Sequence, residues 1–117
     1  RVKFLFPNNY SIYLHDTPSK SLFNEPARAF SHGCIRVGEP VRLAEYLLRN
    51  DSLWTPEKIA VAMNSNKETT VSLKTPVPVF IAYFTAWVDR KGRLNFRKDI
   101  YGHDTRLAKV LFNNPAI

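Results

Sequence analysis

The stretch Ser31-His32-Gly33-Cys34-Ile35-Arg36-Val37 decides how the rest of this sequence is interpreted. It places His32 and Cys34 on either side of a glycine, and residues two apart share one face of an extended segment. Gly33 lets a substrate approach the backbone closely. Because cysteine attacks as a thiolate, and an ordinary thiol is only a few per cent ionised near neutral pH, a reactive Cys34 requires a nearby base.

Cys34 is the only cysteine in the chain, so an internal disulfide and a cysteine-only zinc site are excluded. An isolated cysteine is more often a small buried hydrophobic residue than a nucleophile. Cys34 alone therefore allows either a packing role or a nucleophilic role. The neighbouring histidine and glycine favour the nucleophilic role.

A second histidine, His15, precedes Ser31 with fifteen residues between them. The order His, spacer, Ser-His-Gly-Cys resembles the signature of the L,D-transpeptidase catalytic domain, also called the YkuD domain. The segments Tyr13–Pro18 and Tyr101–Asp104 resemble the Gram-negative periplasmic branch of that family. The resemblance covers nearly the whole chain.

This resemblance implies a set of catalytic residues. Cys34 matches the nucleophile, and His15 matches the general base and acid. A backbone carbonyl beside that histidine, from Asp16 or a neighbour, would orient the imidazole. Backbone N–H groups of Gly33 and Cys34 would form part of an oxyanion hole. His32 would shape the site, either by a direct role or by hydrogen bonding within the motif.

The resemblance also implies substrate-binding residues. Many family members carry asparagine two residues after the cysteine, whereas arginine is usual in the Gram-negative branch and is present here as Arg36. Its guanidinium would either clamp a substrate carboxylate bidentately or pair with Glu39 as a structural contact. Ser31 and Tyr13, which lie beside the two catalytic residues in the chain, are assigned to substrate binding with it.

The implied reaction is acyl transfer on peptidoglycan stem peptides. The thiolate attacks the L,D peptide bond of a tetrapeptide donor, the terminal D-amino acid leaves, and a thioester forms. A diaminopimelate amine of a neighbouring stem then attacks, although a lipoprotein lysine or water would use the same residues. No cofactor is needed, and the family's sensitivity to carbapenems, a class of β-lactam, extends to this chain as an expectation.

Length and composition fit one ordinary soluble domain: 117 residues, 44% hydrophobic and 23% charged. The net charge of +7 favours anionic partners. Nucleic acid is not expected, because the basic residues are scattered and no RNA-binding strand motif is present. The apolar stretch Val77–Val88 is shorter than a membrane span, and Arg1–Pro7 lacks the apolar run of a signal peptide. A periplasmic location is implied by the resemblance alone.

The pattern predicts a mainly β chain with short helices, in the α+β class. The family fold makes this a YkuD-type β-sandwich, and residues 1–117 are expected to be the C-terminal part of a single catalytic domain that lacks its N-terminal strands. The expected strands are 2–6, 10–15, 69–73, 77–88 and 94–96, with a turn at 89–92. The expected helices are 39–49, 55–63 capped by Thr55, and 104–112 capped by Asp104, with a helical turn at 21–23 in the loop 16–29.

Two alternatives come from other functional classes. A metal-binding module would use His15, His32, Cys34 and His103 as zinc ligands, but their spacing is not that of a recognised zinc finger. A non-catalytic wall-binding module would be marked by replacement of Cys34 or His15, and both residues are present.

Overall fold

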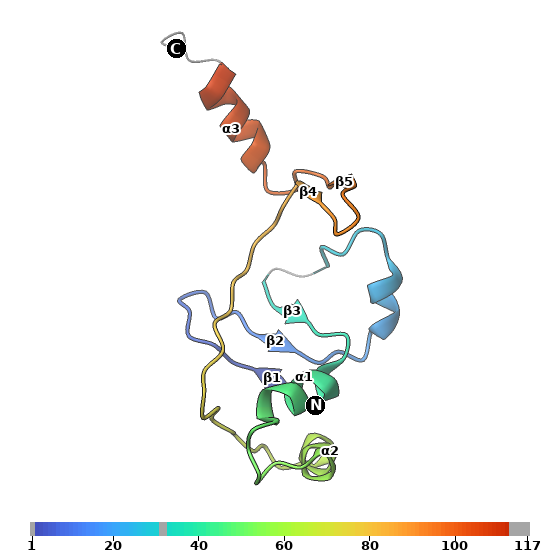
Figure 1. Ribbon diagram of the computed structural model, residues 1–117, viewed down its shortest axis with the longest axis vertical. Helices are drawn as coiled ribbons and strands as arrows, with labels where there is room; N and C mark the ends of the chain where they lie inside the picture. The colour runs from blue at the N-terminus through green and yellow to red at the C-terminus, as the bar shows by residue number, and fades with distance from the viewer. Residues whose placement is uncertain (1, 31–32, 113–117) are drawn as a thin grey trace. The chain divides into compact units, whose positions relative to one another are not determined.

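The computed structural model describes residues 2–30 and 33–112, which form three α-helices, one 3-10 helix and five short strands in two sheets (Figure 1). The chain divides into two compact units, residues 1–79 and 80–117. The predicted mixed α+β class is confirmed. In the described residues, however, more residues lie in helices than in strands, because most of the expected strand residues have no partner strand to hydrogen-bond with.

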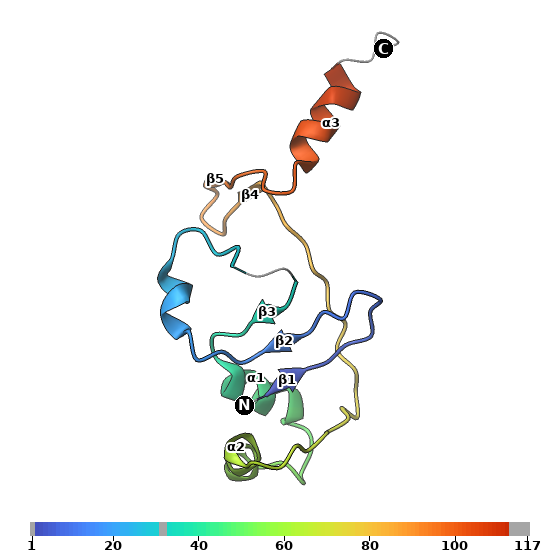
Figure 2. The same cartoon turned by 180° about the vertical axis from the view of Figure 1, so that it is seen from behind.

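The first unit contains a three-stranded sheet in the order β1 (Lys3–Phe4), β2 (Leu14–His15), β3 (Ile35–Arg36), seen from the two sides in Figures 1 and 2. β1 pairs antiparallel with β2, and β2 pairs parallel with β3. The expected strands 2–6 and 10–15 are therefore present but shorter, and β3 was not predicted as a strand.

Asn8 explains why β1 and β2 are short. Its Oδ1 accepts hydrogen bonds from the backbone N–H groups of Tyr10 and Ile12, at 2.9 and 3.1 Å. Its Nδ2 donates to the carbonyl oxygens of Phe6 and Ile12, at 3.0 and 2.8 Å. The side chain thus satisfies backbone groups that a longer ladder would otherwise pair.

The connection from β2 to β3 contains a 3-10 helix, η1 (Lys20–Asn24). This confirms the helical turn expected at 21–23. η1 has no buried residue.

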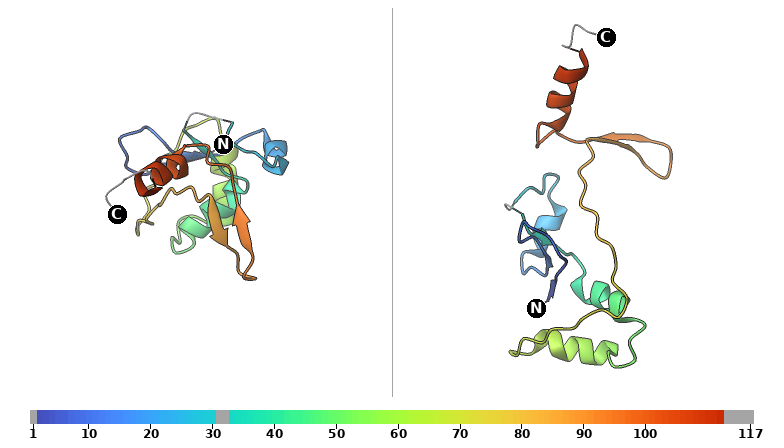
Figure 3. Two further views of the ribbon diagram at one scale, coloured as in Figure 1. Left: turned by 90° about the horizontal axis from the view of Figure 1, so that it is seen from above. Right: turned by 90° about the vertical axis from the view of Figure 1, so that its left-hand side faces the viewer.

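Two helices follow the sheet, α1 (Pro40–Leu48) and α2 (Pro56–Asn64), and they pack against each other (Figure 3). Both begin with proline, which suits the first turn of a helix. The Thr55 hydroxyl accepts from the Lys58 N–H at 3.4 Å, so the predicted cap is confirmed. Ala44 of α1 and Ile59 of α2 are buried, with 6% and 3% of their surface exposed, and they form the small apolar core of the described residues.

The second unit contains the hairpin β4 (Ala86–Val88) and β5 (Leu94–Phe96), followed by α3 (His103–Phe112). The hairpin turn is confirmed: the Asp89 carboxylate accepts from the N–H groups of Lys91 and Arg93, and Gly92 adopts φ +74°. No residue in 80–112 is buried. Within the part that the structure describes, no helix has the length and apolar character required to cross a bilayer.

Three sequence predictions about these elements are wrong: two strands and one helix cap. Residues 69–73 and 77–85 form no strand, since they have the β-branched composition of strands but pair with no neighbour. Asp104 is not the cap of α3 but lies in its first turn. The Asp99 carboxylate instead accepts from the backbone N–H and the hydroxyl of Thr105, at 3.0 and 3.1 Å.

Candidate active site

The register of the three-stranded sheet shows on which face of the sheet each predicted site residue lies. Lys3, His15 and Arg36 are cross-strand partners and share one face, whereas Phe4, Leu14 and Ile35 share the other. Cys34 immediately precedes Ile35, whose N–H donates to the Tyr13 carbonyl at 3.1 Å. Strand alternation therefore assigns Cys34 and Tyr13 to the His15 face.

Ring contacts on that face agree with the assignment of Tyr13. The rings of Tyr13 and His15 meet edge to face with centroids 5.8 Å apart, and the Lys3 ammonium lies 5.4 Å from the Tyr13 centroid. Tyr13, His15 and Cys34 are all half-buried. This exposure suits side chains that both pack and meet a substrate.

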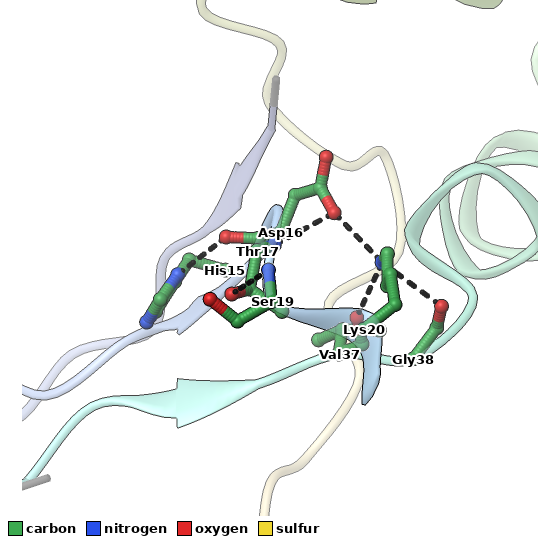
Figure 4. A network of polar contacts seen from close by, with 7 residues as sticks. All are labelled: His15, Asp16, Thr17, Ser19, Lys20, Val37 and Gly38. Carbon is green, nitrogen blue, oxygen red and sulfur yellow. Dashed lines mark hydrogen bonds and ion pairs between the residues drawn. The ribbon is translucent and has the colours of Figure 1, made fainter. Parts of the chain in front are cut away.

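The His15 imidazole is held by the main chain. Its Nδ1 lies 2.6 Å from the carbonyl oxygen of Asp16 (Figure 4). Because a carbonyl oxygen only accepts hydrogen bonds, Nδ1 must carry the hydrogen. In the neutral ring, Nε2 then holds the lone pair and can take a proton. The resemblance implied this contact from Asp16 or a neighbour, and it is present from Asp16.

The Asp16 side chain turns away from the imidazole and into a polar network (Figure 4). Its Oδ1 accepts from the Thr17 N–H at 2.7 Å and from the Lys20 ammonium at 2.9 Å. The hydrogen bond from Lys20 is the largest cause that holds the pKa of Asp16 below its usual value, and burial partly opposes it. Asp16 is therefore a carboxylate near neutral pH, and its carbonyl, not its side chain, contacts His15.

Arg36 lies beside His15 in the register and is half-buried. Its Nη1 is buried and has no hydrogen-bond partner among the described residues. The other predicted partner, Glu39, accepts from Arg42 Nη1 at 3.0 Å. A guanidinium N–H that is buried without an acceptor costs free energy, and a carboxylate is the acceptor that it would bind most strongly.

Gly33 is exposed. A Cβ built on it would meet only Ile12 Cγ1, at 3.7 Å, which is ordinary contact. Nothing within the described protein therefore demands glycine here. Ser31 and His32, the other two predicted residues of the motif, lie outside the described residues.

The zinc alternative requires His15, His32, Cys34 and His103 to lie together. Across residues 2–30 and 33–112, no three His, Cys, Asp or Glu side chains gather as metal ligands. Of the four residues considered for zinc, His32 is outside the described range. His103 opens α3, where its Nδ1 lies 3.0 Å from Arg106 Nη2.

Sequence reasoning missed Lys20 and Thr17. Thr17 is buried, with 6% of its surface exposed, and its hydroxyl accepts from the Ser19 N–H at 3.2 Å. Lys20 donates to Asp16 and also to two carbonyl oxygens beyond β3. The one sequence signal for the Lys20 contact was its position four residues after Asp16, which indicates a pair only on a helix.

Comparisons with known proteins identify the family. The family model of the L,D-transpeptidase catalytic domain, YkuD, matches residues 1–81. A protein of Haemophilus influenzae named "Putative L,D-transpeptidase" is 40% identical over 105 residues, which is 90% of this chain. The match covers 21% of that relative's length, so the chain spans about a fifth of it. The residues placed on the His15 face all lie within the matched range, and the chain belongs to the L,D-transpeptidase catalytic domain family, YkuD.

Proposed function

We propose that the protein is a peptidoglycan L,D-transpeptidase that works through a thioester on Cys34. The observation that carries this proposal is the 2.6 Å contact between His15 Nδ1 and the Asp16 carbonyl. It leaves Nε2 of the neutral imidazole as a base on the sheet face to which Cys34 is assigned. A cysteine, a base and a group that orients the base are the parts that nucleophilic acyl transfer requires.

The first half-reaction breaks the L,D peptide bond of a tetrapeptide donor stem. His15 takes the thiol proton, and the thiolate of Cys34 bonds to the carbonyl carbon. The carbonyl electron pair moves to oxygen, where backbone N–H groups of Gly33 and Cys34 stabilise the oxyanion. When the carbonyl re-forms, the C–N bond breaks, and the terminal D-amino acid leaves with the proton held by His15.

The second half-reaction resolves the thioester. A diaminopimelate amine of a neighbouring stem bonds to the thioester carbon, His15 accepts its proton, and the C–S bond breaks to restore the Cys34 thiolate. The product is a cross-link between two stems. A single imidazole serves both halves because the proton that it takes in one step is given to the leaving group, and the ring can then accept another.

Arg36 would bind a carboxylate of the donor stem. Two observations support this role over a structural pair with Glu39, which is bound by Arg42: Arg36 Nη1 has no hydrogen-bond partner within 2–30 and 33–112, and Arg36 lies beside His15 in the register. The net charge of +7 suits stems that carry several carboxylates. Tyr13 would line the same face, and the roles of Ser31 and His32 remain predictions from the motif.

Replacing Arg36 tests the carboxylate contact. Arg36→Met should raise KM for the donor about 10- to 100-fold, the scale of a lost charge-assisted hydrogen bond, and should change kcat little. Arg42→Met is the matched control, since it removes an exposed arginine of α1, six residues further along the chain, and should leave KM unchanged. If both variants raise KM equally in steady-state kinetics, the overall positive charge of the protein, not a specific contact with Arg36, determines donor binding.

The remaining features follow from family membership. We propose that the enzyme works in the periplasm, that carbapenems acylate it, and that residues 1–117 belong to one sandwich-type domain completed by upstream strands. The large apolar side chains exposed on the described residues, such as Leu5, Phe80 and Phe96, support further packing partners. In this proposal, the diaminopimelate amine is the acceptor of the acyl group.

A mass spectrum of muropeptides before and after incubation with the full-length protein tests the proposed function. The tetrapeptide donor should lose its terminal D-amino acid, and a cross-linked dimer should appear with a new bond to the diaminopimelate amine. The spectrum names the donor, the acceptor and the bond together. Unchanged muropeptides would contradict the proposal, and release of the D-amino acid without a dimer would assign water as the acceptor.

A further inference from the structure

The ammonium group of Lys20 joins the two segments that carry the proposed site (Figure 4). It lies 2.9 Å from Asp16 Oδ1, 3.2 Å from the Val37 carbonyl oxygen and 3.0 Å from the Gly38 carbonyl oxygen. Asp16 directly follows His15, and Val37 directly follows Arg36. Lys20 thus connects the end of β2 to the end of β3.

These contacts close a ring around the backbone of His15. The Val37 N–H donates to the His15 carbonyl at 2.8 Å, and the Val37 carbonyl accepts from Lys20. Lys20 in turn donates to the Asp16 carboxylate, and the Asp16 carbonyl accepts from His15 Nδ1. The orientation of the imidazole is therefore connected to β3 through one lysine.

The chemistry of lysine fits this position. An ammonium has three hydrogens and no acceptor, and here it meets three oxygen acceptors. The Lys20 side chain is 46% exposed, and that of Asp16 is 24% exposed. Ion pairs at such positions contribute little to stability. The value of this contact is therefore geometric: it restrains the Asp16 carboxylate relative to the end of β3 and, through the same residue, the carbonyl that contacts His15.

We propose that Lys20 is a positioning residue for the His15 imidazole. This inference rests on the proposed function, in which His15 is the base. With Lys20 in place, the Asp16 carbonyl stays at Nδ1 and keeps the lone pair on Nε2. Without Lys20, Asp16 keeps the bond from its own N–H to the Val2 carbonyl and the bond from the Thr17 N–H to its carboxylate, at 3.0 and 2.7 Å, but it loses its connection to the end of β3. The Asp16 carbonyl is then less restrained, and the tautomer with hydrogen on Nε2, which cannot accept the thiol proton there, becomes more populated.

The test is the rate of Cys34 alkylation by iodoacetamide across pH in the full-length protein, followed by mass spectrometry of the Cys34 peptide. Lys20→Met keeps the length and the apolar stem of the side chain and removes the three donors. It should slow alkylation at neutral pH about 10- to 100-fold, the scale of a misplaced catalytic group. Its profile should move to higher pH, in the direction of His15→Ala.

Lys74→Met is the matched control. Lys74 also donates to an aspartate in the first unit, Asp51, at 3.1 Å, so the two variants lose the same charge and the same kind of pair. Both should melt at similar temperatures, but Lys74→Met should keep the wild-type alkylation profile.

The outcomes separate this inference from the proposed function. If His15→Ala shifts the profile and Lys20→Met does not, the positioning role is wrong and the function stands. If both lysine variants slow alkylation equally, the effect is one of general stability and the positioning role is again wrong. An unshifted profile in His15→Ala overturns the function, and the positioning role with it.

A second variant covers the case in which Lys20→Met does not fold. Lys20→Arg keeps the charge, but its planar guanidinium cannot direct three hydrogens from one nitrogen toward these acceptors. Its profile should lie between those of wild type and His15→Ala. A wild-type profile would show that charge alone is sufficient and would overturn the geometric role.

Discussion

Cys34→Ser is expected to reduce transpeptidation by at least about 10³-fold, the scale on which loss of the nucleophile acts in other acyl-transfer enzymes. A hydroxyl is far less ionised than a thiol, so no adequate nucleophile remains. The replacement is small and Cys34 is half-buried, so the fold should be retained. The measurement is dimer formation from purified muropeptides by the full-length protein.

Circular dichroism and the melting temperature of Cys34→Ser provide the control. Both should match wild type, which assigns the loss to chemistry. A correctly folded variant that still forms dimers at a comparable rate would remove Cys34 from the mechanism.

His15→Ala is expected to slow formation of the acyl-enzyme about 10²- to 10⁴-fold, the usual contribution of a general base and acid. The alkylation profile of Cys34 should also move to higher pH, because no imidazole then accepts the thiol proton. Single-turnover acylation and iodoacetamide labelling measure these two effects independently.

His103→Ala is the matched histidine variant for this prediction. His103 lies at the start of α3 in the second unit, where it contacts Arg106. The His103→Ala variant should form the acyl-enzyme and react with iodoacetamide at the wild-type rates. Loss of rate in both histidine variants, or in neither, would contradict the assignment of His15 as the base.

The contact that orients the His15 ring could be predicted from the sequence because it depends on a local motif. The contact between His15 and Asp16 joins adjacent residues, so a resemblance that fixes the residue order also fixes the contact. Helices α1 and α2 were predicted for the same reason, since the starting prolines and the Thr55 cap are local signals.

The features that were missed depend on residues far apart in the chain. The contacts of Lys20 with Val37 and Gly38 span 17 and 18 residues. Residues 77–85 have the composition of a strand but pair with no strand in the described part of the chain. β3 consists of two residues that become a strand only beside β2. The β-propensity of a sequence describes one segment, whereas the hydrogen-bond ladder of a sheet requires two paired segments.

The hydrogen bonds that Asp99 accepts at the start of α3 were also not predicted, although they connect residues closer in the chain. Asp104 has the residue type expected at a helix start, but Asp99 reaches Thr105 from six residues upstream. Gly102, with φ +66°, lies between them. The turn around this glycine brings Asp99 back to the helix, and sequence spacing alone does not reveal such a turn.

The central claim, that Cys34 forms an acyl-enzyme, is tested most directly by carbapenem labelling of the full-length protein near neutral pH. The strained lactam presents the same electrophile as the donor stem. Intact mass should rise by one inhibitor, the labelled peptide should contain Ser31–Cys34, and Cys34→Ala should show no adduct. Absence of an adduct from the folded wild-type protein, or an adduct that persists in Cys34→Ala, would contradict the account.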